Sequence, residues 1–146
     1  MNMNRSTDEL MKVLKEKDSI DSFLNENKDE MISNDLKKAM EDMLEKYGMS
    51  RQEVIVSTHI ERSYLYRLMS GERVNPSRDV LLQFGLALKA DLDDVQKLLR
   101  IARLCMLYPR VKRDAIIIHS LNLKEGVTRC DEVLFDHGEK LLGERK

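Results

Sequence analysis

The chain has 146 residues, of which 42% are apolar and 35% are charged, and its net charge is −1. This composition is too apolar for a wholly disordered chain and too charged for a membrane protein, and the near-zero charge excludes a uniformly basic nucleic-acid-binding protein. Only 2 prolines and 6 glycines interrupt a chain rich in Leu, Met, Lys and Glu. The sequence therefore predicts an all-α fold.

Several kinds of segment and site are missing from the sequence. Apolar runs such as residues 115–118 are far shorter than the roughly 20 residues of a membrane span, and the first residues form no apolar signal region. Cys105 and Cys130 have no paired spacing, so we expect buried reduced thiols. The three histidines lack metal-ligand spacing, and no phosphate loop or nucleophile pattern occurs. We expect a cytoplasmic protein with no membrane partner, metal, cofactor or enzymatic activity.

Residues 1–33 are predicted to form an N-terminal helical extension. Ser6 and Glu9 have the spacing of a capping box, in which two side chains satisfy each other's backbone amides. Apolar residues recur at helical spacing as far as Leu24. The wholly polar residues 25–30 predict a break or an exposed joint before Met31 and Ile32.

Residues 34–108 contain helical patterns in close succession and are predicted to form one domain. Ser50 and Glu53 form a second capping box, and Ser77 is a predicted N-cap. The last helix of this domain has Asp91 and Asp94 as predicted caps and an apolar spacing that continues through Cys105 and Met106 to Pro109. Helix ends are predicted at Gly48 and Gly71.

Residues 109–146 are predicted to form a C-terminal helical extension. The apolar run 115–118 suits a strand as well, but a single strand among helices has no partner for its backbone, so we predict a buried helix. Thr128 and Asp131 are predicted to cap a last helix that ends at Gly138.

Two roles are open for this C-terminal extension. Its apolar residues exceed what two short helices bury, which favours a homodimer formed through the C-terminal helices. The alternative is that the extension completes the core of a single chain by packing onto Leu98, Ala102 and Cys105.

Charge is distributed unevenly along the chain. Residues 1–48 carry 8 basic and 12 acidic side chains, residues 49–90 carry 6 and 4, and residues 91–146 carry 11 and 10. Phosphates would repel the acidic N-terminal end, so we expect a protein partner at residues 1–33 and any nucleic-acid contact in the middle of the chain.

The middle of the chain contains a family pattern. It consists of Ser50 with Glu53, Ile60, the run Arg62-Ser63-Tyr64-Leu65, Leu68 with Ser70 and Gly71, Arg73, the run Asn75-Pro76-Ser77, Leu81-Leu82 and Ala87-Leu88. Residues 50–77 with these features resemble the helix-turn-helix of the phage-repressor (Xre/Cro, lambda-repressor-like) family, and weaker similarity extends from about 34 to 99. The resemblance implies a bundle of about five helices that places the helix at about 61–70 in the major groove of double-stranded DNA, as in bacterial transcriptional regulators.

Three residues depart from the family pattern. His59 occupies the turn position where the family usually has glycine, so we expect a positive φ there. Ile55 replaces a small residue, which predicts a wider spacing between the two short helices. Glu61 is a favourable anion at a helix start but would repel nearby phosphates.

Helical geometry predicts which side chains face the DNA. Directing Leu65 and Leu68 at the core, at about 100° per residue, places Ser63, Tyr66, Arg67 and Ser70 on the opposite face and Arg62 at its rim. Because arginine suits the O6/N7 edge of guanine, the predicted base-reading residues are Arg62, Ser63, Tyr66 and Arg67. Tyr64 and Met69 are predicted to pack inward.

Phosphate contacts are predicted at the ends of these helices. Arg51 lies in a first turn, where free amides favour an anion, and the loop after Gly71 matches backbone-contacting positions of the family. The predicted phosphate contacts are Arg51, Ser70, Arg73 and Asn75, and Arg78 is a weaker candidate.

Three classes of function remain. We predict a sequence-specific DNA-binding transcriptional regulator. The alternative is an all-α adaptor that keeps the repressor fold without binding DNA, because tyrosines such as Tyr66 are also enriched at protein interfaces and exposed arginines are also found on ordinary solvated helices. An enzyme is the least favoured class.

Overall fold

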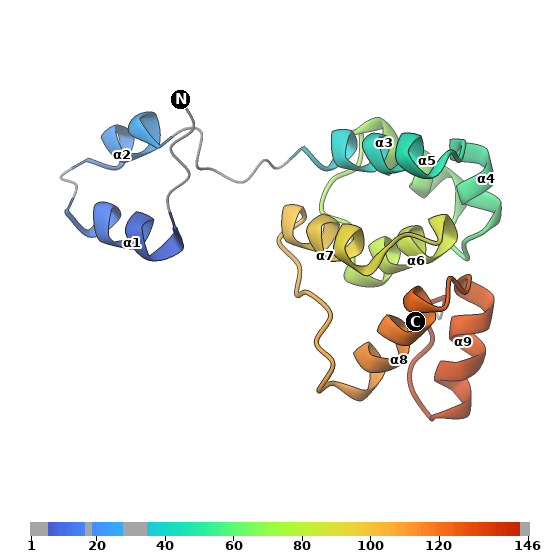
Figure 1. The fold of residues 1–146 in the computed structure, drawn as a ribbon. Coiled ribbons are helices and arrows are strands. Elements are labelled where there is room, and N and C mark those ends of the chain that lie inside the picture. The colour runs from blue at the N-terminus through green and yellow to red at the C-terminus, as the bar shows by residue number, and fades with distance from the viewer. Residues whose placement is uncertain (1–5, 17–18, 28–34, 144–146) are drawn as a thin grey trace. The chain divides into compact units, whose positions relative to one another are not determined.

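A computed structural model describes residues 6–16, 19–27 and 35–143, and every regular element in these ranges is an α-helix (Figure 1). The predicted all-α class is therefore confirmed. The chain divides into two compact units, Met1–Ser33 and Asn34–Lys146. None of the helices in the described ranges combines the length and apolar character needed to cross a bilayer.

The N-terminal unit contains α1 (Thr7–Glu16) and α2 (Ile20–Glu26). The predicted capping box is present, because Ser6 and Glu9 exchange backbone-to-side-chain hydrogen bonds of 3.1 Å in both directions. Phe23 of α2 is buried, whereas α1 buries no residue. Helix α2 ends at Glu26, within the polar residues 25–30; residues 28–34, where the break or exposed joint is predicted, lie outside the described ranges.

The second unit begins with α3 (Leu36–Tyr47), α4 (Arg51–Val56) and α5 (Arg62–Ser70). Asp35 accepts a hydrogen bond from the Lys38 amide at the start of α3, and Gly48 ends that helix at φ 65°. Gly71 ends α5 in the same left-handed region, at φ 87°. These ends are the predicted ones, because glycine adopts positive φ without steric cost.

The centre of the second unit is α6 (Arg78–Leu88), which packs on α7 (Leu92–Ile101). All residues from Leu81 to Leu88 are buried, and Figure 1 shows α6 and α7 between the helices that precede and follow them. A Cβ atom at Gly85 would lie 2.6 Å from Cγ2 of Val95, so only glycine permits this approach of the two helices. Ser77 caps α6 as predicted.

The predicted continuation of α7 to Pro109 is wrong. The helix ends at Ile101, and Arg103 turns the chain at φ 61°. The amide of Gln96 then bonds both backbone groups of Leu107, at 2.9 and 2.8 Å, and these bonds replace the missing helical ones. Cys105 consequently leaves the apolar face of the helix and is exposed rather than buried, whereas Cys130 is buried as predicted.

The predicted cap at Asp91 is also wrong in its details. Asp91 precedes α7, but its side chain makes no capping bond and pairs with Lys124 instead. Asp94 accepts hydrogen bonds from Lys46 and from the Tyr47 hydroxyl. Both carboxylates therefore bind side chains from distant parts of the chain instead of capping the backbone amides at the start of α7.

Two further helices, α8 (Lys112–Asn122) and α9 (Val127–Asp136), complete the second unit. The apolar run 115–118 is helical, as predicted. Gly126, not Thr128, precedes α9, and the carboxylate of Asp131 accepts hydrogen bonds from the amides of Leu142 and Gly143 rather than capping the helix.

Residues 109–143 contribute to the same core as residues 35–108. Helices α8 and α9 both contact α6, and their buried residues join one cluster with those of α3 to α7. Ile117 and Leu134 are fully buried, while Phe135 remains 73% exposed. The core of one chain thus takes up only part of the apolar excess that suggested a homodimer, because residues 115, 116, 118 and 133 are half-buried, and the homodimer stays a prediction.

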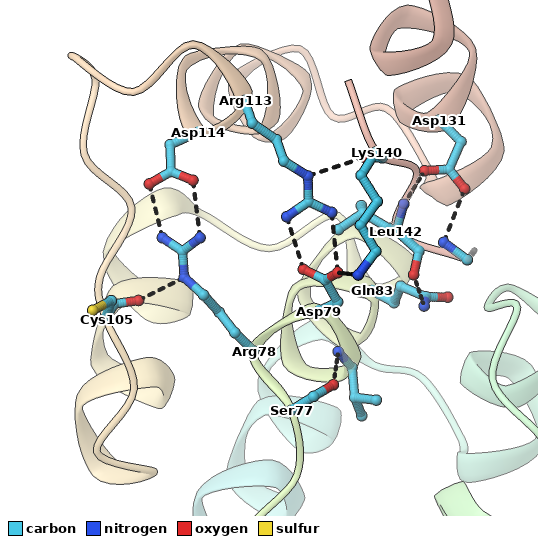
Figure 2. A network of polar contacts seen from close by, with 12 residues as sticks. Ser77, Arg78, Asp79, Gln83, Cys105, Arg113, Asp114, Asp131, Lys140 and Leu142 are labelled. Carbon is cyan, nitrogen blue, oxygen red and sulfur yellow. Dashed lines mark hydrogen bonds and ion pairs between the residues drawn. The ribbon is translucent and has the colours of Figure 1, made fainter. Parts of the chain in front are cut away.

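Two ion pairs connect the start of α6 to α8 (Figure 2). Arg78 donates to both carboxylate oxygens of Asp114, at 2.9 and 2.8 Å. Arg113 donates to both oxygens of Asp79, at 3.0 Å each. Bidentate geometry makes such pairs specific in orientation, so the C-terminal helices have a defined position relative to the first turn of α6.

Candidate nucleic-acid interface

Helices α4 and α5 are joined by the turn of residues 57–61. The capping box that opens α4 is complete, because Ser50 Oγ accepts from the Glu53 amide at 3.1 Å and the Glu53 carboxylate accepts from the Ser50 amide at 3.0 Å. These hydrogen bonds hold the pKa of Glu53 below its usual value. Thr58 Oγ1 donates to the carbonyl of Ile55 at 3.1 Å. Local bonds therefore define where α4 begins and how it ends.

A buried glutamine of α6 holds this turn in place. Gln83 Oε1 accepts from the His59 amide at 2.8 Å, and Gln83 Nε2 donates to the carbonyl of Leu142 at 3.0 Å. This role of Gln83 was not predicted from the sequence. The available signal was a single polar side chain in the apolar run 80–88, since a buried polar group needs hydrogen-bond partners.

The departures from the family pattern have structural outcomes. The positive φ expected at His59 is wrong: within the described ranges, the non-glycine residues with positive φ are Asn75, Lys89, Arg103 and Lys124. The hydrogen bond from the His59 amide to Gln83 and a 3.2 Å contact between its ring and Thr128 Oγ1 hold it in place. Ile55 is buried in the core.

Glu61 is the N-cap of α5. Its carboxylate accepts a hydrogen bond from the Ser63 amide at 2.8 Å. That backbone hydrogen bond is the main reason why the pKa of Glu61 lies below its usual value. The carboxylate is therefore charged at neutral pH and weakens any phosphate contact near the start of α5.

Helix α5 presents the predicted two faces. Leu65, Leu68 and Met69 are buried in the core. On the other side, Ser63 and Arg67 are exposed and Tyr66 is half-buried. The predicted orientation of the helix is therefore observed, while the roles of these side chains in base reading stay predictions.

Two tyrosine rings support arginines at this surface. The guanidinium carbon of Arg62 lies 5.7 Å from the ring centroid of Tyr66, and that of Arg73 lies 5.2 Å from the ring centroid of Tyr64. Cation–π contacts at exposed sites contribute about 0.5–1 kcal/mol. They restrict the arginine side chains without neutralising them.

The carboxylates near Arg51 and Arg67 compete weakly for them. Arg51 lies 3.8 Å from Glu41, and Arg67 lies 4.0 Å from Glu72. All four side chains are well exposed, and ion pairs of this kind contribute about 0–1 kcal/mol. Both guanidiniums therefore remain available to an external anion.

Arg78 is not a free phosphate ligand. Besides its bonds to Asp114, its guanidinium donates to the carbonyl of Cys105 at 2.8 Å (Figure 2) and to the carbonyl of Met106 at 3.0 Å. All three guanidinium nitrogens of Arg78 therefore donate hydrogen bonds within the protein, and Arg78 is no longer a candidate phosphate contact.

Three of the four predicted phosphate contacts line one groove at the end of α5. Ser70, Arg73 and Asn75 lie there, and Arg51 does not. The Ser70 hydroxyl donates back to the carbonyl of Arg67 at 3.0 Å, so it can meet a phosphate only after releasing that bond or through a bridging water. Lys37 and Arg103 also line the groove and were missing from the sequence prediction.

The chain was compared with protein-family models, curated proteins and solved structures, and none of the three comparisons found a match. The role of the surface formed by α4, α5 and residues 71–77 is therefore inferred from the residues of this chain and their geometry.

Proposed function

We propose that the protein is a sequence-specific DNA-binding transcriptional regulator in which residues 34–108 form a lambda-repressor-like helix-turn-helix bundle and α5 enters the major groove of double-stranded DNA. The single observation that supports this proposal most strongly is the division of α5 into a buried leucine face and an exposed face with Ser63, Tyr66 and Arg67. Arg62, at the rim, completes the predicted base-reading set.

The dimensions of α5 suit this role. An α-helix with its side chains is about 10–12 Å in diameter, which matches the width of about 12 Å of the major groove of B-DNA. The 9 residues of α5 extend about 14 Å at 1.5 Å per residue. Contacts from Arg51 and from the loop after Gly71 would then fix the orientation of α5 on the duplex.

The second candidate is an all-α adaptor that has the repressor fold but no DNA. Glu61 and Glu72 favour it, because both carboxylates lie near Arg67, one of the arginines that would meet the DNA. An acidic protein partner would be disfavoured by the same carboxylates. A protein partner at the acidic residues 1–33 and a homodimer through residues 109–146 remain compatible with either candidate.

The salt dependence of binding tests the predicted phosphate contacts. Arg51→Ala and Arg73→Ala are each expected to weaken binding to all duplexes alike and to reduce the log–log salt slope by about one unit, because each removes one charge that displaces a counterion. Fluorescence anisotropy with a labelled duplex at several salt concentrations measures both quantities. Arg73→Lys is the matched control, since it keeps the charge and should keep the slope. Unchanged slopes in both alanine variants would contradict the proposed docking.

A further inference from the structure

A groove with a volume of about 540 Å³ lies at the C-terminal end of α5. It is formed by the first turn of α3, the last turn of α5, the loop after Gly71 and the end of α7. Gly71 packs against the side chain of Lys37, where an added Cβ would lie 3.1 Å from Cδ. Segments far apart in the sequence thus form one concavity next to the predicted DNA-reading helix.

The charged side chains of this groove are mainly positive. Lys37, Arg73 and Arg103 line it, together with the carboxylate of Asp35. Asp35 accepts a hydrogen bond from the Lys38 amide at 3.0 Å. Lys37 and Arg103 form no ion pair with any carboxylate in the ranges that the structure describes. Three cations in a concave site with a single carboxylate attract anions.

We propose that this groove binds a phosphate group, and that the phosphate belongs to the backbone of the DNA that α5 contacts. The inference rests on the proposed function and extends the phosphate contacts to Lys37 of α3 and to Arg103, which follows the end of α7. A guanidinium offers two parallel donors to phosphate oxygens, and the lysine adds a compact positive charge. A free phosphorylated small molecule has the same chemistry, and the experiment below separates the two sources.

The loop that lines the groove is attached to α5, so a phosphate bound in the groove would affect the position of the base-reading side chains. The Arg73 amide donates to the carbonyl of Arg67 at 3.0 Å, so the loop is attached to the last turn of the helix. Asn75 holds the loop in a left-handed conformation at φ 58°, which asparagine adopts more readily than most residues. A phosphate in the groove would therefore set the register of Arg67 against the bases.

The helix end at Arg103 offers a variant that removes the charge without harming the fold. Arg103 has φ 61°, and the Leu104 amide bonds the Leu99 carbonyl at 2.9 Å. Lys89 ends α6 in the same way, at φ 54° with a 3.0 Å bond from the Ala90 amide to Gly85. Glycine suits both positions better than any charged residue. Arg103→Gly and Lys89→Gly are thus matched, but only Arg103 lines the groove.

The experiment measures duplex binding by the full chain between 50 and 200 mM salt, with thermal unfolding as the check on folding. Lys37→Ala and Arg103→Gly are expected to reduce the salt slope by about one unit each, on random and preferred sequences alike. Lys89→Gly should leave the slope unchanged. Duplex binding with unchanged slopes in Lys37→Ala and Arg103→Gly would overturn the groove inference while leaving the proposed function standing. No duplex binding by the wild-type protein would overturn both.

A titration with inorganic phosphate at constant ionic strength identifies the source of the anion. We expect the backbone amide resonances of Gly71 and Arg103 to shift on addition of a duplex and to stay in place with millimolar phosphate alone. Saturable shifts with inorganic phosphate that disappear in Lys37→Ala, together with an unchanged duplex slope in that variant, would assign the groove to a free phosphorylated ligand and overturn the DNA assignment.

Discussion

Asp114→Asn is expected to lower the free energy of unfolding by about 3–5 kcal/mol, the usual consequence of breaking a buried ion pair by removing one partner. The Asp114 side chain is only 6% exposed. It accepts two hydrogen bonds from Arg78 and a third, of 3.0 Å, from the Tyr108 amide. The substitution would leave the Arg78 guanidinium charged and without its partner. Urea denaturation of the wild-type protein and the variant measures the difference.

The same carboxylate makes stability depend on pH in a defined direction. Burial raises the pKa of Asp114, but the hydrogen bonds from Arg78 and Tyr108 outweigh burial and hold the pKa below its usual value. Because the folded-state pKa is depressed, this contribution is complete above the unfolded pKa of about 3.9 and is lost as the pH falls through the lower folded value. The difference between wild type and Asp114→Asn should therefore shrink below about pH 4.

The control is Asp136→Asn, which removes an exposed carboxylate at the end of α9. Exposed substitutions of this kind change stability by less than about 0.5 kcal/mol. Equal losses in Asp136→Asn and Asp114→Asn, or a difference between wild type and Asp114→Asn that stays constant down to pH 2, would show that the Arg78–Asp114 pair does not connect α6 to α8 as described.

Arg67→Ala is expected to have the largest effect on sequence preference. The Arg67 side chain is 49% exposed on the outward face of α5, where it can reach base edges. Losing a bidentate contact to guanine costs about 1–3 kcal/mol on the preferred duplex and much less on random DNA. Selection from a random duplex library would first provide the preferred sequence, and binding to it and to a scrambled duplex would then be compared. Equal losses on the two duplexes would place Arg67 among the phosphate contacts.

Local signals in the sequence were enough to predict the helix starts. The capping boxes at Ser6 and Ser50 and the cap at Ser77 depend on residues three positions apart, so the sequence specifies them directly. The caps expected at Asp91 and Thr128 failed because distant residues took those side chains. Lys124 pairs with Asp91 across 33 positions, and the His59 ring contacts Thr128 across 69.

At the candidate site, too, local patterns predicted one part of the structure, and contacts between distant residues determined the rest. Helical periodicity predicted which side of α5 is buried, because Leu65 and Leu68 are large apolar residues three positions apart and so lie on one face of the helix. Periodicity could not predict that Gln83 holds the turn before α5, or that Lys37 and Arg103 meet at its end. Gln83 belongs to α6, Lys37 belongs to α3 and Arg103 follows α7, and only the packing of the helices brings these residues to the site.

Binding of the wild-type chain to a mixed-sequence duplex at 50 and 200 mM salt tests the central claim most directly. With two to four phosphate contacts, affinity is expected to fall about 10–100-fold between these concentrations, because each contact releases a counterion and the slope is about −0.9 per contact. An adaptor with the same fold would bind no duplex at either concentration. Absence of binding at 50 mM salt, or an affinity that does not change with salt, would contradict the proposal that this protein binds DNA through α5.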